Sequence, residues 1–526
     1  VVDLASWWVG AVVVPIYPTA SSAQAAQVIA DCRPALAVLG GSAEHTILDA
    51  ALERLEPAPS ISTWTMDTGA HDLDALRSLG HDVTEDTVEA RRARVRSDDI
   101  ATIVYTSGTT GSARGVRITH ANLVGVVRNV QAAYAEVIHE GASTVIFLPL
   151  AHVLARGLQL VAIATGMRTA HLADPASVVA TLPTLRPTFL VVAPRVLQRI
   201  RAAVAAKAQR AHLGRLYAAA DVTAVAWGRH LERRQDDPRA TAPLGLRLRH
   251  AVFDRLFYAR VRALLGGRVE SLLSGAASLG ADLSLYFRGL DIPVIEGYGL
   301  TETTAPATGQ RPGDIRAGTV GVPIPGTAIR LADDGEIQVR GVGVTPGHTD
   351  PADDAAAFTV DGWLHTGDLG TVDERGHLTV VGRRKDTLVT SSGKSIEPGP
   401  WETTVGAHPL VAHAVMVGTD RPYAAALLLL APDELRAWAE QHDRPDLAEL
   451  VRDPASPPGT LLDDAALSLA LQPAVEAANA EVSRSEQARR FRAVIVDLDE
   501  CTTPTLKLRR SAYLESATAL IDDLYA

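Results

Sequence analysis

The alternation of short apolar runs with longer amphipathic stretches predicts a layered α/β fold for the first part of the chain. Apolar runs stand at Ala35–Leu39, Ala101–Tyr105 and Thr144–Leu148. Runs of this length between turn residues are typical of buried strands, and the stretches that separate them have the length and spacing of helices. We therefore expect strands covered by helices from Val1 to about Leu182.

Two later segments have different patterns. Arg195–Arg268 is rich in Ala, Leu and Arg and is predicted to be helical, with a break at Asp236–Pro238. From 316 to 381, short apolar stretches alternate with Gly, Pro and Asp turns such as Pro323–Gly326 and Asp373–Gly376. This second pattern predicts a small β-rich subdomain.

A third pattern begins after Asp386, where the strand-like runs Val411–Val417 and Ala424–Leu430 mix with helical stretches. The fold class predicted is α/β, with a large N-terminal α/β domain that contains the β-rich subdomain and a small, mobile α+β C-terminal domain. We place the N-terminal domain at 1–382, a hinge at 383–386 and the C-terminal lid domain at 387–526. Because the chain opens on Val1 inside an apolar pattern, we expect the domain to begin upstream of it.

Composition narrows the class of protein. The chain of 526 residues is 47% hydrophobic and carries 50 Lys and Arg against 61 Asp and Glu, which argues against binding nucleic acid over its whole surface. Cys32 and Cys501 are far apart, so no disulfide framework is expected and a reducing compartment fits. The apolar stretch Leu4–Tyr17 contains Pro15, is too short to span a bilayer and follows no basic segment. We therefore expect a cytoplasmic protein.

The loop Thr106–Gly111 follows the predicted strand Ala101–Tyr105 and consists of Thr, Ser and Gly. Small residues let successive backbone N–H groups turn toward a phosphate, and the hydroxyls add donors. Such a loop is also found as a plain linker. It is not a Walker A loop, because Ser-Ala-Arg follows Gly111 in place of Lys-Ser.

Five further motifs follow this loop in order. The six are Tyr105–Val116 (YTSGTTGSARGV), Leu148–Val153 (LPLAHV), Glu296–Glu302 (EGYGLTE), Asp361–Leu369 (DGWLHTGDL), Gly382–Asp386 (GRRKD) and Pro504–Arg510 (PTLKLRR). Together they resemble the motifs of the adenylate-forming superfamily, which includes acyl-CoA synthetases, luciferases and the adenylation domains of peptide synthetases. The resemblance covers essentially the whole chain.

The resemblance implies a reaction in two steps. A carboxylate attacks the α-phosphorus of ATP to give an acyl adenylate and pyrophosphate, and a thiol then displaces AMP. The first step joins two anions, so donors and cations are needed around the phosphates. The resemblance assigns phosphate contacts to Thr106, Ser107, Gly108, Thr109, Thr110, Gly111 and Thr301, Mg²⁺ to Glu302, the ribose to Asp368 and Arg383, and adenine to Gly275, Ala276, Tyr298 and Gly299.

Four other residues match positions of the family. Lys507 matches a catalytic lysine whose ammonium reaches both the carboxylate and the α-phosphate in the adenylating conformation, the alternative being a solvated basic tail. Lys385 matches the hinge about which the C-terminal domain turns between the two steps. Gly393 would line the tunnel for the pantetheine of coenzyme A, where bare backbone permits close approach. His152 matches a position beside the acyl pocket, the alternative being a satisfied core histidine.

Within the superfamily, the long helical segment before the Tyr298 motif and the closing Thr503–Arg510 resemble long-chain fatty acyl-CoA synthetases. The function expected is ATP-dependent activation of a long-chain fatty acid and its transfer to coenzyme A. Two alternatives stay open, an acyl-AMP ligase that passes the acyl group to a carrier protein and a non-catalytic nucleotide-binding relative. The sequence departs from the family at Ala113-Arg114, at Ser278 and at His348, which leaves its nucleotide affinity open.

The helical segment Arg195–Arg268 has sixteen Lys and Arg against five Asp and Glu, although the whole chain is acidic. Charge alone favours solvated helix faces. An anionic, amphiphilic substrate and the aromatic residues Trp227 and Tyr258, which carry polar groups, favour reversible docking on the inner face of an anionic membrane, whereas the neighbouring Phe257 is purely apolar. The sequence leaves the oligomeric state open, with a homodimer among the states considered.

Overall fold

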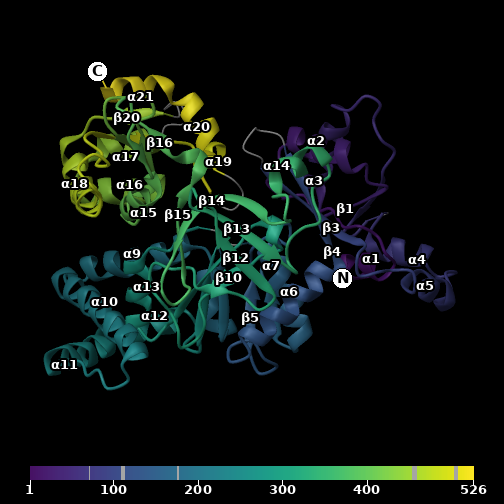
Figure 1. Cartoon of the computed structure of the whole chain (residues 1–526), viewed down its shortest axis with the longest axis horizontal. Coiled ribbons are helices and arrows are strands. Elements are labelled where there is room, and N and C mark those ends of the chain that lie inside the picture. Colours follow the sequence, from purple (N-terminus) through teal and green to yellow (C-terminus); the bar gives the residue numbers. More distant parts are fainter. Residues whose placement is uncertain are drawn as a thin grey trace.

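The computed structural model describes residues 1–525 except 70, 108–112, 175, 176, 276, 453–458 and 503–506. Figure 1 shows the C-terminal part above the helices of the basic segment, with the first hundred residues on the opposite side of the molecule. Among the described helices, none is both long enough and apolar enough to cross a membrane.

The N-terminal segment forms a small layer of its own, in which β1 and β2 pair in parallel. Its elements are α1 (Val2–Trp8), α2 (Ser22–Cys32), β1 (Leu36–Leu39), α3 (Ser42–Leu52), β2 (Ser62–Thr65), α4 (Leu73–Leu79) and α5 (Glu85–Arg92). Next come β3 (Ile100–Ser107) and β4 (Ala113–Thr119), an antiparallel pair whose connection contains 108–112. The strand predicted at Ala101–Tyr105 is thereby confirmed.

The centre of the N-terminal domain is a five-stranded sheet of order β11-β10-β9-β8-β7, whose strands β7, β8 and β9 are parallel. Its strands are β7 (Phe189–Val192), β8 (Ser271–Ser274), β9 (Val294–Tyr298), β10 (Thr308–Gly309) and β11 (Val322–Pro323). A parallel pair, β5 (Ser143–Ile146) and β6 (Arg168–His171), accompanies α6 (His120–Ala133), α7 (Val153–Thr165), α8 (Val178–Leu185) and α13 (Ala281–Gly289). The predicted α/β architecture is confirmed.

Helix α6 illustrates how local sequence fixes a boundary. The Thr119 hydroxyl accepts a hydrogen bond from Asn122 N at 3.1 Å, and Asn122 Oδ1 accepts one from Thr119 N at 2.9 Å. This reciprocal cap satisfies N–H groups at the start of the helix that have no partner within it. The same Asn122 side chain donates to Val342 O and Val344 O, which joins the start of α6 to the β-rich subdomain.

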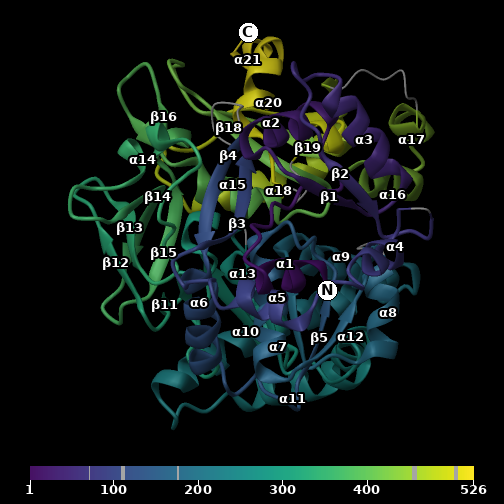
Figure 2. The ribbon, with the colours of Figure 1, turned by 90° about the vertical axis from the view of Figure 1, so that its right-hand side faces the viewer.

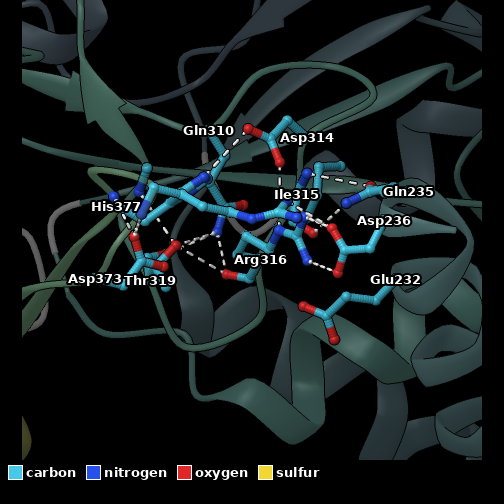
Figure 3. Close-up of polar contacts among 12 residues, drawn as sticks. Glu232, Gln235, Asp236, Gln310, Asp314, Ile315, Arg316, Thr319, Asp373 and His377 are labelled. Carbon is cyan, nitrogen blue, oxygen red and sulfur yellow. Dashed lines mark hydrogen bonds and ion pairs between the residues drawn. The ribbon is translucent and has the colours of Figure 1, made fainter.

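The basic segment is helical as predicted. It contains α9 (Pro194–Arg210), α10 (Gly214–Asp236), α11 (Leu244–Phe253), a π-helical turn (Asp254–Tyr258) and α12 (Ala259–Leu264). The predicted break is the end of α10, where Asp236 accepts from Arg316 (Figure 3). Asp236 also pairs with Arg375 at 2.5 Å. The Arg316 guanidinium lowers the pKa of Asp236 to about 2. This network joins the helical segment to the loop before the β-rich subdomain.

The expectation that Trp227 and Tyr258 face a membrane was wrong for Tyr258. Phe257 is 8% exposed and Tyr258 only 1%, and the Tyr258 hydroxyl donates to Ala220 O at 2.6 Å inside the helical core. Trp227 is half-buried and stacks on His250, with ring centroids 4.4 Å apart. The Tyr258 hydroxyl and the Trp227 ring thus contribute to packing between helices.

The β-rich subdomain is a four-stranded antiparallel sheet of order β12-β13-β14-β15, which confirms the prediction for this region. It comprises β12 (Thr327–Leu331), β13 (Glu336–Gly341), β14 (Leu364–Val372) and β15 (Leu378–Arg383), with helix α14 (Pro351–Ala357) between the second and third strands.

The C-terminal part has its own core around the strand order β18-β19-β21-β20, in which Trp401 and Val405 of α15 are buried. Its strands are β16 (Leu388–Val389), β17 (Ser395–Ile396), β18 (Val411–Val417), β19 (Ala425–Leu430), β20 (Thr460–Leu462) and β21 (Phe491–Ile495). Its helices are α15 (Pro398–Gly406), α16 (Pro432–Gln441), α17 (Pro445–Arg452), α18 (Ala465–Ala480), α19 (Leu498–Cys501), α20 (Arg510–Ser516) and α21 (Thr518–Tyr525). The strands predicted at 411–417 and 424–430 are confirmed.

Candidate active site

A cavity of about 710 Å³ lies where the two parts of the chain meet. The ends of β8 and β9, the β-rich subdomain and two cationic residues of the C-terminal part, Lys507 and Arg509, line it. A cavity of this size accommodates a ligand of nucleotide size, and the carboxyl ends of parallel strands are a common position for such a site. The predicted residues that line it are Thr106, His152, Gly275, Tyr298, Gly299, Thr301, Glu302, Arg383 and Lys507.

The floor of the cavity is the turn that follows β9. A Cβ atom on Gly299 would stand 3.0 Å from Ala307 N and 3.0 Å from Pro306 Cα, so only glycine lets the two backbones approach this closely. The Thr303 hydroxyl accepts from Leu300 N at 2.8 Å and closes the short 3₁₀ turn Thr301–Thr303. This turn holds Thr301 and Glu302 at the cavity wall.

Asp368 is 4% exposed and does not itself line the cavity, but it contacts two residues that do. The Tyr298 hydroxyl donates to Asp368 Oδ2 at 2.8 Å, and Arg383 Nε lies 3.0 Å from Asp368 Oδ1. Burial and the Asp368 carboxylate hold the pKa of Tyr298 well above its usual value, so its hydroxyl stays a donor. Each carboxylate oxygen keeps further acceptor capacity. Asp368 is therefore a fixed anion able to receive hydroxyl groups.

Lys507 brings a cation from the C-terminal domain into the same cavity. Burial of its ammonium group lowers the pKa of Lys507, and Arg383 lowers it further, whereas Asp368 and Glu302 raise it. Lys507 as a whole is exposed, although burial acts on its ammonium group. A cation in these surroundings is weakly screened and acts strongly on an anionic group that enters.

His152 caps α7, because its Nδ1 accepts from Leu154 N at 3.2 Å. Burial and the nearby Lys507 lower the pKa of His152 to about 4, so the imidazole is neutral at pH 7. Both interpretations of His152 therefore apply: it is a hydrogen-bonded residue of the fold, and it also lines the cavity.

Other predicted residues lie elsewhere. Gly108, Thr109, Thr110, Gly111 and Ala276 fall outside the described residues, and Ser107 is described only as the last residue of β3. Lys385 stands in the 3₁₀ turn Arg384–Asp386 and does not line the cavity. Burial lowers its pKa. Gly393 occupies the turn between β16 and β17 with φ +77° and open space around it.

Several lining residues were not singled out from the sequence. Buried Glu336 accepts from His365 Nδ1 at 2.7 Å, from Gly367 N at 2.9 Å and from Arg384 at 3.1 Å. It thereby fixes the turn before Asp368 and also Arg384, a residue of the expected hinge. Arg114, noted only as a departure from the family, pairs with Asp353 at 3.3 Å. The only sequence signal for such contacts is charge, because the partners are distant along the chain.

A direct contact holds the C-terminal domain against the N-terminal domain. Arg195 at the start of α9 donates from one Nη1 to Val411 O at 2.9 Å and to Ala412 O at 3.0 Å. One turn further along α9, Arg199 pairs with Glu434 at 3.4 Å. These contacts belong to the domain orientation in which Lys507 lines the cavity.

A second, apolar cavity of about 60 Å³ adjoins the first and lies between α6 and α7. The two cavities share lining residues that include Val153, Leu154 and Leu273. Gly157 of α7 and Tyr134 after α6 also line the apolar cavity. The wall beside His152 is therefore continuous with an apolar channel.

The donor atoms at the cavity bear on whether it can hold a metal ion. Among the residues that the structure describes, no group of three or more His, Cys, Asp or Glu could hold a metal ion. Mg²⁺ is commonly bound by one or two carboxylates together with the phosphates of the substrate. Glu302, one of the carboxylates that line the cavity, fits that mode and not a site made of protein ligands alone.

Comparison with known proteins agrees with this geometry. Residues 1–348 match the AMP-binding enzyme family and residues 385–526 match the AMP-binding enzyme C-terminal domain. The chain is 37% identical to the long-chain-fatty-acid–CoA ligase FadD15 of Mycobacterium bovis, over 100% of this chain and 86% of that protein. It is 29% identical to human long-chain-fatty-acid–CoA ligase 1, over 82% of this chain and 63% of that protein.

Solved structures share the fold. The A-PCP didomain of the carboxylic acid reductase from Segniliparus rugosus, in complex with AMP, superposes with a TM-score of 0.69 at 21% identity, covering 100% of this chain and 70% of that one. ATP-bound MatB from Rhodopseudomonas palustris superposes with a TM-score of 0.64 at 20% identity, covering 98% and 85%. Family models over most of the chain and the two-part fold around one cavity lead to the same conclusion: the chain belongs to the AMP-binding enzymes of the adenylate-forming superfamily.

Proposed function

We propose that this enzyme is an AMP-forming long-chain-fatty-acid–CoA ligase. It activates the acid with ATP to an acyl adenylate, releases pyrophosphate and then transfers the acyl group to coenzyme A. The ligase relatives match over the whole chain. The observation that carries the mechanism is Lys507 of the C-terminal domain, which lines the same cavity as Thr301 and Glu302 of the N-terminal domain.

In the first step the carboxylate oxygen attacks the α-phosphorus, and the bond to pyrophosphate breaks. Lys507 offsets the charge of the two anions as they approach, and Thr301 donates to the α-phosphate. The loop that begins at Thr106 holds the outer phosphates through backbone N–H groups. Glu302 and the phosphates would hold Mg²⁺, which would supply further positive charge to the phosphate groups.

Asp368, together with Tyr298 and Arg383, orients the nucleoside part of ATP. Asp368 accepts from the ribose hydroxyls while Tyr298 and Arg383 hold its carboxylate in place. The adenine ring stacks on Tyr298 and approaches the bare backbone at Gly275, where an added Cβ would make only ordinary contacts at 3.6 Å and beyond. These groups bind and position the substrate but exchange no proton with it.

The acyl chain enters the apolar channel between α6 and α7. His152 stands at its mouth as a neutral group, which keeps a second cation away from the chain. The channel is only about 60 Å³ in volume. A long chain therefore requires the aliphatic side chains of the two helices to move apart.

In the second step the C-terminal domain turns about Lys385. We place the N-terminal domain at 1–382, the hinge at 383–386 and the C-terminal domain at 387–526. The turn withdraws Lys507 and presents Gly393 to the pantetheine of coenzyme A. The thiol then attacks the acyl carbon, and AMP leaves with the oxygen that had joined it to the acyl group. The enzyme works in the cytoplasm, in reversible contact with the inner face of the membrane.

Two product measurements test this function. The chain is incubated with ATP, Mg²⁺ and a long-chain saturated acid, with and without free coenzyme A, and pyrophosphate and thioester are quantified. The proposal predicts pyrophosphate from the acid and ATP, and thioester with equal AMP once coenzyme A is added. Pyrophosphate without thioester identifies an acyl-AMP ligase that needs a carrier protein. Neither product identifies a non-catalytic nucleotide-binding relative.

A further inference from the structure

An apolar stripe lies on the outer face of α11. Its members are the aliphatic residues Leu244, Leu248, Val252 and Leu256, spaced four apart along α11 and the turn that follows it, with exposed fractions of 69%, 60%, 54% and 38%. Four large aliphatic side chains in one exposed row are unusual on a protein surface, where single exposed apolar residues are the norm. We call this row the α11 stripe.

The stripe faces outward because the opposite side of α11 is anchored in the core. Leu246 is 7% exposed and Phe253 is 6% exposed. The His250 side chain bonds through Nε2 to Gly289 O at 2.8 Å. At about 100° per residue, these three positions lie roughly opposite the stripe. The helix cannot rotate to bury the stripe without breaking these contacts.

Basic side chains border the stripe on both sides. Arg247 and Arg249 lie about 60° to either side of it on the helix, and both are exposed. Arg239, Arg255 and Arg260 are exposed as well. Within the part of the chain that the structure describes, none of these five arginines makes an ion pair with an acidic residue. The one acidic residue from 239 to 260, Asp254, pairs with Arg262 at 2.6 Å.

The place of α11 leaves the stripe accessible to a large, flat partner. Figure 1 shows α11 at the lower left margin of the molecule, and Figure 2 shows it at the lower margin after a quarter turn. A planar surface can therefore approach α11 before it meets most of the protein.

We propose that the α11 stripe is a docking surface for an anionic lipid bilayer, with α11 lying in the plane of the interface. A helix with an apolar face between basic residues binds this way, with the aliphatic side chains among the acyl chains and the arginines at the headgroups. The inference rests on the proposed function in one respect, because a long-chain fatty acid partitions into bilayers and docking brings the enzyme to it.

Charge distinguishes a bilayer from a second copy of the chain. In a symmetric dimer through α11, the same patch of each copy would form the interface, so the five unpaired arginines of one copy would lie against the five of the other. Like charges brought together across an interface oppose association. An anionic bilayer supplies the opposite charge and a surface that extends over the whole patch.

Co-sedimentation of the full chain with vesicles tests the proposal. Vesicles of phosphatidylcholine alone are compared with vesicles that also contain phosphatidylglycerol, at low and high salt. The double variant L248S/V252S removes half of the stripe, and R247Q/R249Q removes the two bordering charges. Matched controls are L469S, at a leucine 75% exposed on α18, and R91Q/R94Q, which removes two exposed arginines elsewhere.

Binding is expected with phosphatidylglycerol, weaker at high salt. The stripe variant should lower the partition coefficient by at least about tenfold. The arginine variant should lower it by a similar factor and flatten the salt dependence, as expected from the loss of two charges near the headgroups. Both controls should bind like the wild type. Equal binding by the wild type and the stripe variant would overturn the proposal.

Two further measurements separate other outcomes. If the wild type does not bind vesicles but its mass in solution falls on the L248S/V252S substitution, the stripe joins copies of the chain and the proposal is wrong. Thioester formation from detergent-dispersed fatty acid without vesicles should be the same in all variants. Its absence in the wild type would contradict the proposed function, while vesicle binding would still report on the surface.

Discussion

Replacing Arg195 by alanine should slow the first half-reaction selectively. Arg195 belongs to α9 of the N-terminal domain, yet its Nη1 donates to Val411 O and Ala412 O at the start of β18. Both acceptor residues are buried, with exposed fractions of 0% and 7%. The contact exists in the orientation that places Lys507 in the cavity, and a rotation of the C-terminal domain would break it.

The size of the effect follows from this contact. A hydrogen bond from a charged group contributes roughly 1.5–3 kcal/mol net. Because both bonds here come from one nitrogen atom, we take about 2 kcal/mol for the pair. That free energy corresponds to a factor of about thirty in the equilibrium between domain orientations. Pyrophosphate release from the acid and ATP should fall by up to this factor, since the adenylating orientation becomes less populated.

The assay compares the two half-reactions separately. Pyrophosphate release is measured without coenzyme A, and thioester formation is measured from a synthetic acyl adenylate with coenzyme A. R195A should reduce the first and leave the second unchanged or faster. R199Q is the matched control, because the pair of Arg199 with Glu434 is partly exposed and such pairs contribute less than about 1 kcal/mol. An equal loss in both half-reactions, or no loss in the first, would refute the reasoning.

Three further predictions concern the site itself. K507A should lower pyrophosphate release at least about a hundredfold while thioester formation from supplied acyl adenylate persists. The control is K394A, which removes a lysine paired with Glu486. Equal loss of both half-reactions in K507A would contradict this prediction. G157L should raise KM for a long-chain acid roughly tenfold and leave KM for a short acid unchanged. The reason is that a Cβ at Gly157 meets open space in the helix that lines the apolar channel, so a leucine there would fill the channel. An unchanged chain-length profile would exclude that channel as the acyl site. The pKa of His152, about 4 in the fold, is below its ordinary value of 6.5, so the unfolded chain binds the extra proton and the free energy of unfolding falls as the pH drops from 6.5 to 4. This accounts for about 3 kcal/mol, and H152Q should remove that part of the slope in denaturant titrations; identical slopes would show that His152 is not the group.

The sequence predicts the strands of the C-terminal domain well, because their pattern is local. Val411–Val417 (VAHAVMV) consists mainly of Val and Ala, and it forms β18 with the same bounds. The helical segment is also predicted by composition and spacing, including its break at Asp236. In both cases the residues that decide the structure are neighbours in the chain.

The side chains that face outward were harder to predict. Tyr258 was expected at a membrane surface, but a π-helical turn at Asp254–Tyr258 shifts the helical phase and directs its ring into the core. The exposed stripe lies instead on aliphatic residues of α11 such as Leu248. A helical pattern gives the spacing of a face, whereas tertiary packing decides which face is covered.

Contacts across the cavity could be predicted only through the family motifs. Nothing local to Tyr298 or Asp368 indicates that the hydroxyl of one meets the carboxylate of the other, 70 positions away. The Arg195 contact with Val411 spans 216 positions and belongs to no motif, so it could not be predicted from the sequence. The structure adds this contact between domains to the expected set of residues.

The central claim is that the acid is activated by attack of its carboxylate oxygen on the α-phosphorus, in the cavity that Lys507 completes. A fatty acid labelled with heavy oxygen in its carboxylate tests this directly, by mass spectrometry of the AMP formed during turnover with coenzyme A. One carboxylate oxygen becomes the bridge of the acyl adenylate and stays with AMP when the thiol attacks the acyl carbon. The account predicts one labelled oxygen in each AMP, and AMP without label would contradict it.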